Sequence, residues 1–199
     1  VRDQTAEEQE EMKQELEEME AIATNPEPPT FENTIVAMEK SGELLRRTSS
    51  VFYNLTSAHT NDKIQEIQSE MAPKLAAHSD DILLNADLFD RVKTLYQKRD
   101  ELDLDEASLK LLEDTHREFV RAGAELSEKE KERMREINER VSTLTTQFQD
   151  NLLEVTQERA VLVDDVNKLD GLSEDRISAA KEAAAERGED GQYLLTITN

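Results

Sequence analysis

The feature that most constrains the fold is one long amphipathic stretch at residues 127–157. Burying seven large apolar side chains is worth roughly 10 to 20 kcal/mol, at about 1.5 to 3 kcal/mol each. Fixing the backbone of about thirty residues in a helix costs about 1 to 2 kcal/mol per residue, which is more in total. The helix therefore needs partners, and its apolar stripe is predicted to be buried. Ser127 and Glu130 have the spacing of a capping box at its start. The apolar residues recur at steps of three and four, which places them on one side of a helix: Met134, Ile137, Val141, Leu144, Phe148, Leu152 and Val155.

The preceding residues are predicted to form shorter helices with the same apolar rhythm. Thr5 and Glu8 have capping-box spacing before a helix that ends near Ala23. Closely spaced prolines then form a stiff, extended connector at residues 25–29. Gly123 is predicted to end a later helix, ahead of the long one. The other helices are predicted to begin at cap or turn residues, namely Thr30, Asn61, Asn85, Asp105 and Ser173.

Two residues interrupt the helical pattern. Gly42 stands where another apolar residue is expected between Met38 and Leu45. We interpret this glycine as a position where a neighbouring helix approaches closely. The alternative is a break in the helix near Ser41 and Gly42. Pro73 lies inside the next helix, where proline removes a hydrogen bond. A kink or a restart of the helix is therefore expected at Pro73.

The pattern changes after the long helix. Residues 160–163 form a short apolar run without helical period and are predicted to be a strand, as are residues 193–197. We expect an N-terminal helical domain at 1–159 and the start of an α+β segment (strand, helix, strand) at 160–199. Since the sequence begins at Val1 and ends in an apolar strand, we expect a piece of a longer protein. The predicted fold class is all-α, an elongated antiparallel bundle of six or seven helices with a short β element near the C-terminus.

Charge restricts the classes of partner. Charged residues make up 35% of the chain and aromatic residues 4%, a composition typical of helical proteins. The net charge is −22, from 46 acidic and 24 basic residues. Nucleic acid and anionic membranes are therefore not expected as partners, because both are bound by clustered Lys and Arg. We interpret the acidic excess as a solvated surface, and the alternatives are a salt-adapted surface or an attractor for basic partners.

Residue types that are missing exclude further chemistry. The chain has no cysteine, which excludes disulfides, thiolate zinc sites and thiol nucleophiles. No apolar run approaches the roughly 18 residues that span a bilayer, and the N-terminus is unlike a signal peptide. We therefore expect a cytoplasmic location.

Few residue patterns point to catalysis. None of His59, His78 and His116 begins an H-E-x-x-H zinc motif. Glu113 and His116 form one E-x-x-H, but helical metal sites of this kind need two copies, so a plain histidine on a helix face is the preferred interpretation. Adjacent carboxylates are interpreted as solvated surface because neighbouring helical residues face different sides: Glu10–Glu11, Glu17–Glu18 and Asp164–Asp165. No catalytic, cofactor-binding or metal-binding residue is predicted in this chain.

Several runs nevertheless resemble a known family. Residues 20–35 read EAIATNPEPPTFENTI, and residues 51–62 read VFYNLTSAHTND. APKLAAHSDDI at 72–82, FVRAGAELSEKEK at 119–131 and LDGLSEDRI at 169–177 follow in the same order. Together they resemble the N-terminal region of the thimet oligopeptidase family of zinc metallopeptidases, nearest its bacterial peptidyl-dipeptidases and oligopeptidases A.

The resemblance implies a mostly helical fold in two lobes around a narrow channel that admits short peptide substrates. It also implies that zinc is held in the parent protein by an H-E-x-x-H helix and a later Glu in the missing C-terminal catalytic lobe. This chain would then wall the channel, bind no zinc itself and be inactive alone. We further expect the isolated piece to dimerise through its exposed docking face. The alternative is an acidic helical scaffold or interaction module without enzyme activity.

Overall fold

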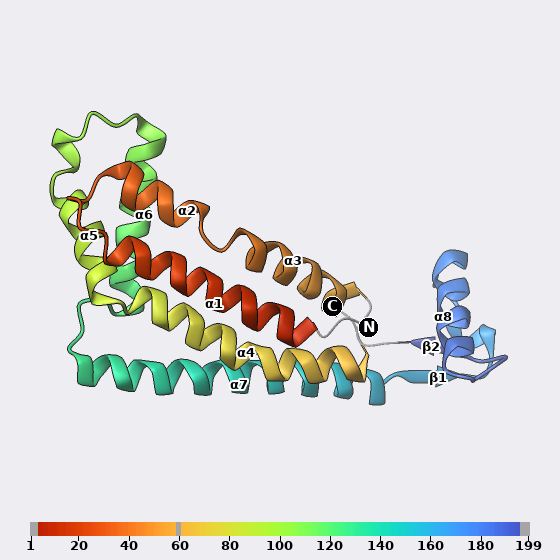
Figure 1. Cartoon of the computed structure of the whole chain (residues 1–199). Coiled ribbons are helices and arrows are strands. Elements are labelled where there is room, and N and C mark those ends of the chain that lie inside the picture. The colour runs from red at the N-terminus through yellow and green to blue at the C-terminus, as the bar shows by residue number, and fades with distance from the viewer. Residues whose placement is uncertain (1–3, 59–60, 196–199) are drawn as a thin grey trace. The chain divides into compact units, whose positions relative to one another are not determined.

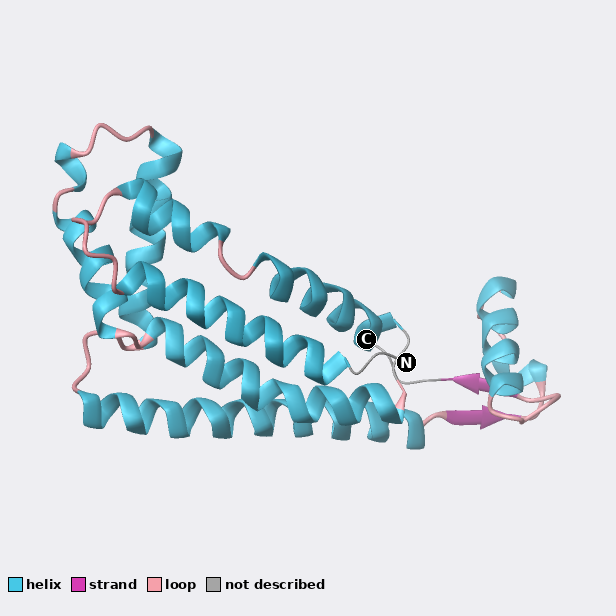
Figure 2. Cartoon of the chain, viewed as in Figure 1, coloured by secondary structure: helices cyan, strands magenta, loops and turns pink. Residues whose placement is uncertain are grey.

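The structure is a computed structural model that describes residues 4–58 and 61–195. Helices account for most of these residues, as Figure 1 and Figure 2 show, and one antiparallel pair of strands lies near the C-terminus. The all-α class with a short β element is therefore confirmed. The elements in chain order are α1 (Gln4–Ala23), the π-helical η1 (Phe31–Val36), α2 (Ala37–Lys40), α3 (Glu43–Ala58), α4 (Asp62–Leu83), α5 (Ala86–Gln97), the 3-10 turn η2 (Arg99–Glu101), α6 (Glu106–Ala122), α7 (Glu128–Glu158), β1 (Val161–Val163), the 3-10 turn η3 (Val166–Leu169), α8 (Glu174–Glu186) and β2 (Tyr193–Leu195).

The chain divides into two compact units, Val1–Thr146 and Gln147–Asn199. Helix α7 is continuous across the division. The domain boundary expected from the sequence, with domains 1–159 and 160–199, stays a prediction. Within the described residues no helix is both long and apolar enough to cross a membrane.

The main core of the first unit lies where α1, α5 and α6 meet. The predicted three-four spacing gives most of their apolar faces, but buried Phe89 falls outside the predicted positions and Val120, a predicted position, is 37% exposed. A smaller cluster of Met12, Leu45 and Met71 joins α1, α3 and α4. The buried members of the main cluster are Met19, Ile22, Ala23, Ile35, Leu88, Phe89, Val92, Leu95, Leu112, Phe119 and Ala124.

Predicted caps mark the starts of most helices. Thr30 forms a capping box with Asn33, and a side-chain oxygen accepts from the backbone three residues on at the starts of α4, α5, α6 and α8. At α7 the predicted box is half formed, because Glu130 accepts from both the backbone N–H and the hydroxyl of Ser127. The box predicted at Thr5 is wrong, since Thr5 lies inside α1. Gly123 ends α6 with φ +107°, as predicted.

Buried Arg91 fixes the proline connector to the core. Its Nη1 donates to the backbone oxygens of Asn25 at 3.0 Å and Glu27 at 3.1 Å. Its Nη2 donates to Oδ1 of Asn33 at 2.9 Å. The extended connector is therefore tied to α5 by one guanidinium group, which supplies several donors in a fixed geometry.

The helix predicted from Thr30 through Leu55 is not continuous. Ser41 is extended and Gly42 has φ +63°, so the chain breaks between α2 and α3. The alternative of a break is thus confirmed. The close approach is also present, because a Cβ on Gly42 would lie 2.0 Å from Oε1 of Glu15 on α1. Of the kink or restart expected at Pro73, the restart is wrong, since α4 runs unbroken from Asp62 to Leu83. The kink stays a prediction.

Helix α7 has the predicted extent, but its apolar stripe is not buried as predicted. Val141 is 55% exposed and Phe148 is 66% exposed. The side of α7 that is covered carries polar residues instead, including Lys131 and Thr146. Periodicity identified the stripe correctly, and the error lay in assuming that this chain supplies its partner.

The second unit contains the predicted strand pair. Val161 pairs with Leu195, Leu162 with Leu194 and Val163 with Tyr193, in antiparallel register. Helix α8 packs on β2. The buried side chains in the described part of this unit are small or aliphatic: Leu169, Ala180, Ala184 and Leu194. Residues 196 and 197 of the predicted second strand lie outside the described residues.

Candidate functional site

Four glutamates with buried or half-buried side chains lie along one face of α1. Glu8, Glu11, Glu15 and Glu18 are spaced by three, four and three residues, which brings their side chains to one side of the helix. Glu8 is fully buried and the other three are half-buried. We call these four residues the carboxylate face of α1. Burying carboxylates is costly unless they are hydrogen-bonded or paired, so their partners decide what this face does.

Glu15 meets a histidine from another helix. Oε2 of Glu15 lies 2.8 Å from Nε2 of His78 on α4, and the two side chains are 15% and 8% exposed. Because an ionised carboxylate only accepts hydrogen bonds, Nε2 carries the proton and donates it to Glu15. Nδ1 of His78 has no hydrogen-bond partner in the described part of the chain. The pair therefore joins α1 to α4 inside the first unit.

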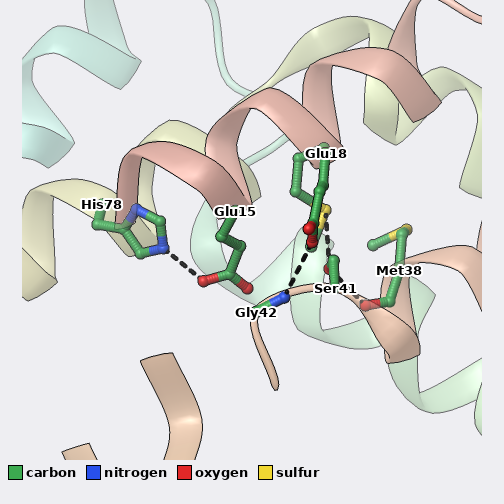
Figure 3. Close-up of polar contacts among 7 residues, drawn as sticks. Glu15, Glu18, Met38, Ser41, Gly42 and His78 are labelled. Atoms are coloured by element: carbon green, nitrogen blue, oxygen red, sulfur yellow. Dashed lines mark hydrogen bonds and ion pairs between the residues drawn. The ribbon is translucent and has the colours of Figure 1, made fainter. Parts of the chain in front are cut away.

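The break between α2 and α3 lies against the same face (Figure 3). The backbone N–H of Gly42 donates to Oε2 of Glu18 at 3.3 Å. The hydroxyl of Ser41 donates to the backbone oxygen of Met38 at 2.7 Å. Since a Cβ at position 42 would collide with the carboxylate of Glu15, glycine lets the turn approach α1 closely.

Two further contacts extend the carboxylate face along α3. Oε1 of Glu11 accepts from the hydroxyl of Thr48 at 2.9 Å. Burial raises the pKa of the Tyr53 phenol, and the negative charge of Glu8 raises it further. The face thus connects α1 to both α3 and α4 through polar contacts.

A pocket of about 210 Å³ opens beside this face. Glu11, Glu15, Glu18 and Glu43 contribute carboxylates to its wall, and Lys40 contributes an ammonium group. Such a pocket favours cations over anions. Within residues 4–58 and 61–195, however, no group of three or more His, Asp and Glu side chains could hold a metal ion. The observed contacts are those of a polar junction between helices.

The E-x-x-H pair of α6 does not form a ligand pair. Oε1 of Glu113 lies 3.9 Å from Nε of Arg99. The ring of His116 stacks on the ring of Tyr96, with 3.8 Å between the centroids and an angle of 5° between the planes. The guanidinium group of Arg99 lies 4.5 Å from the centroid of the Tyr96 ring. Burial lowers the pKa of His116. The preferred interpretation of His116 as a structural histidine fits these contacts.

Of the adjacent carboxylates, Asp164 and Asp165 are both exposed, as the interpretation of a solvated surface predicts. Asp164 pairs with Lys168 at 2.6 Å, while Asp165 accepts from the backbone of Asn167 as a cap. On α1, however, Glu11 and Glu18 are not simple surface residues, because each accepts a hydrogen bond from the α2–α3 region. A search for glutamates three and four apart, rather than adjacent, would have found the carboxylate face.

Comparison with known proteins adds evidence that the site alone does not give. No family model matches the chain. Dipeptidyl carboxypeptidase of Escherichia coli is 43% identical over 188 residues, which is 94% of this chain and 28% of that protein. Dipeptidyl carboxypeptidase of Salmonella typhimurium is 42% identical over the same shares. Oligopeptidase A of Haemophilus influenzae is 29% identical over 84% of this chain and 24% of that protein.

By sequence, the chain is similar to members of the thimet oligopeptidase family. The resemblance expected from the short runs is therefore confirmed across nearly the whole chain. The chain spans less than a third of the length of the curated relatives it matches. The similarity therefore covers only one part of each of these relatives.

The two histidines in the described part of this chain do not fit a zinc site. His78 is occupied by Glu15, His116 is stacked on Tyr96, and His59 lies outside the described residues. A structural or catalytic zinc site needs three or four convergent ligands, which the described residues do not bring together.

Proposed function

We propose that this chain is the helical, channel-walling part of a zinc-dependent peptidase that hydrolyses short peptides. The observation that carries the proposal is the 43% identity to a dipeptidyl carboxypeptidase over 94% of the chain. Relatives named oligopeptidase A match over similar shares of the chain. Both names describe peptidases, and short peptides are the substrates that the second name implies.

The proposal assigns the catalytic zinc to residues outside this chain. No histidine here begins an H-E-x-x-H motif, in which two imidazoles one helical turn apart hold the metal beside a glutamate base. The residues of this chain are therefore proposed to act without a catalytic role, as a wall that limits the size of substrate.

A wall of this kind has to be rigid, and the first unit has features that supply rigidity. The buried Glu15–His78 pair and the Glu18–Gly42 hydrogen bond cross between helices. Arg91 fixes the connector after α1 by three hydrogen bonds. Because these hydrogen bonds join separate elements inside the unit, they favour one arrangement of the helices over others.

The test is an assay of the complete protein that the gene encodes, beside the 199-residue chain. The complete protein is expected to hydrolyse short peptides, to lose activity with a zinc chelator and to regain it with zinc. Mass spectrometry of the products distinguishes release of C-terminal dipeptides from internal cleavage. A folded protein substrate is expected to resist cleavage until it is unfolded.

The 199-residue chain is expected to give no hydrolysis above a metal-free control. Turnover by the chain alone would contradict the assignment of the zinc to other residues. A gene that encodes no H-E-x-x-H motif, with a complete product that cleaves no peptide, would instead favour the acidic scaffold.

A further inference from the structure

Helix α7 carries a row of large apolar residues on its exposed side. We call this row the outer stripe. At 3.6 residues per turn its members stay on one side of the helix, and the helix is continuous over their whole range. The outer stripe consists of Ile137, Val141, Leu144, Phe148, Leu152 and Val155, all of them exposed.

The opposite side of α7 is the side that the first unit covers. Lys131 is 2% exposed and Thr146 is also buried, and Nδ2 of Asn138 donates to Oδ1 of Asp80 on α4 at 2.6 Å. At about 100° per residue, Asn138, Lys131 and Thr146 lie about 80°, 100° and 160° around the helix from the centre of the outer stripe. Helix α7 is therefore attached to the bundle by polar residues, and its apolar side is directed outward.

The charges around the outer stripe favour a protein partner over a lipid surface. Acidic residues outnumber basic ones along α7, whereas helices that lie on membranes are rich in Lys and Arg. Arg133 and Glu136 pair at 2.6 Å beside the stripe, so its border is polar and of mixed sign. An exposed apolar row with a polar border is typical of a surface that packs against protein.

We propose that the outer stripe is the docking surface for an apolar face of the polypeptide that lies outside these 199 residues in the complete protein. The inference rests on the proposed function, because it takes the chain to be part of a larger peptidase. The matched relatives contain more than twice as much polypeptide outside the aligned region as inside it. A segment of the same chain also reaches the stripe at a high effective concentration.

A second copy of the chain is the less favourable occupant. Each copy carries a net charge of −22, and two such molecules repel each other before their apolar rows can meet. A segment of the same protein that docks on the stripe does not bring a second copy of this charge to the interface. The commitment to an intramolecular partner follows from this difference.

The test uses the absence of cysteine from this chain. Val141→Cys places one thiol in the outer stripe, and Val51→Cys places a matched control on α3, where Val51 is 62% exposed. Each variant is made in the complete protein and in the 199-residue chain. Maleimide labelling at that position is then followed by mass spectrometry, with a denatured sample as the reference for full reactivity.

In the complete protein, the thiol at position 141 is expected to label at least about tenfold more slowly than in the 199-residue chain, because it labels only when the docked segment opens. The thiol at position 51 reports whether the fold is intact. Equal labelling at position 141 in both proteins would overturn the proposal. A gene product of only 199 residues would overturn it as well.

Protection in the 199-residue chain that disappears on dilution would show that the isolated piece dimerises through the stripe. Protection in the complete protein that disappears on dilution would indicate a second copy as the occupant and would overturn the proposal. A second variant, Val141→Asp, is expected to lower the melting temperature of the complete protein by about 5 °C or more and to leave that of the 199-residue chain unchanged. A complete protein that protects position 141 but cleaves no peptide would refute the proposed function and leave the docking surface in place.

Discussion

Gly42 shows how one residue serves two neighbouring parts of the fold. Its positive φ ends α2 and starts α3, and its missing side chain leaves room for Glu15. Glu15 is in turn held by His78. The backbone break and the buried Glu15–His78 hydrogen bond therefore depend on the same glycine.

Substitution of Gly42 by alanine is expected to destabilise the first unit more than the same change at Gly171. Both glycines have positive φ, which costs a residue with a Cβ about 1 to 2 kcal/mol. At Gly42 the new Cβ also displaces the carboxylate of Glu15, whereas at Gly171 nothing lies within 4 Å. Urea unfolding of both variants measures the difference. Equal losses of stability would show that the close approach costs nothing.

His116 is a residue whose environment predicts a pH response. Burial lowers its pKa below the ordinary value of 6.5. The folded state therefore binds its proton less tightly than the unfolded state, so the contribution of His116 to stability is present above about pH 6.5 and is lost as the pH falls.

Substitution of His116 by phenylalanine tests this response. Phenylalanine keeps a ring against Tyr96 but does not titrate. The free energy of unfolding of the variant, minus that of the wild type, is expected to increase between about pH 7 and pH 5. Between about pH 7 and pH 8 the difference should stay constant, which serves as the internal control. A difference that is flat over the whole range would refute the depressed pKa.

At the scale of elements, α4 is a continuous helix despite an internal proline. Pro73 lies in the middle of Asp62–Leu83, where it removes one backbone donor. Buried Met71 and the His78 pair fix α4 on both sides of the proline. Tertiary packing therefore maintains a helix that local propensity disfavours.

Substitution of Pro73 by alanine is expected to stabilise the chain by about 1 to 3 kcal/mol, because it restores the donor and raises helix propensity. Substitution of Pro29 in the extended connector is the matched control. There alanine only increases the conformational entropy of the unfolded chain, so the free energy of unfolding is expected to fall by about 0.4 to 1 kcal/mol. Circular dichroism during urea unfolding measures both. A destabilised Pro73→Ala variant would mean that the proline geometry is required by the packing of α4.

At the scale of the whole molecule, charge is the dominant property. The net charge of −22 acts against every compact state of the chain through self-repulsion. Most ion pairs that we observe join residues three or four apart on one helix, such as Lys63–Glu66 and Lys74–Glu70. Exposed pairs of this kind contribute little to stability.

Added salt is therefore expected to raise the melting temperature of the chain. At about 0.15 M ionic strength the screening length falls to about 8 Å, so repulsion across the surface weakens more than short ion pairs do. Thermal unfolding between low and moderate sodium chloride measures the effect, and sucrose at equal osmolarity controls for general solute effects. A melting temperature that falls with salt would mean that the ion pairs outweigh the repulsion.

Most of the helices, most of their caps and the strand pair could be predicted from the sequence. These features depend on neighbours within one or two turns, as Asn61 at the start of α4 and Asp105 at the start of α6 show. Local hydrogen bonding and side-chain period fix them without reference to the rest of the chain. The family was also recognisable from short runs, because several specific runs occur in one order.

The tertiary structure alone decided which side of each helix is covered and by what. The period of α7 located the outer stripe, yet only the packed structure showed that Asn138 and Lys131 lie on the covered side instead. The carboxylate face of α1 was hidden for the same reason, since glutamates at helical spacing are typical of both solvated and buried faces. Burial is a property of contacts between distant segments, and a periodic pattern specifies a face without specifying its partner.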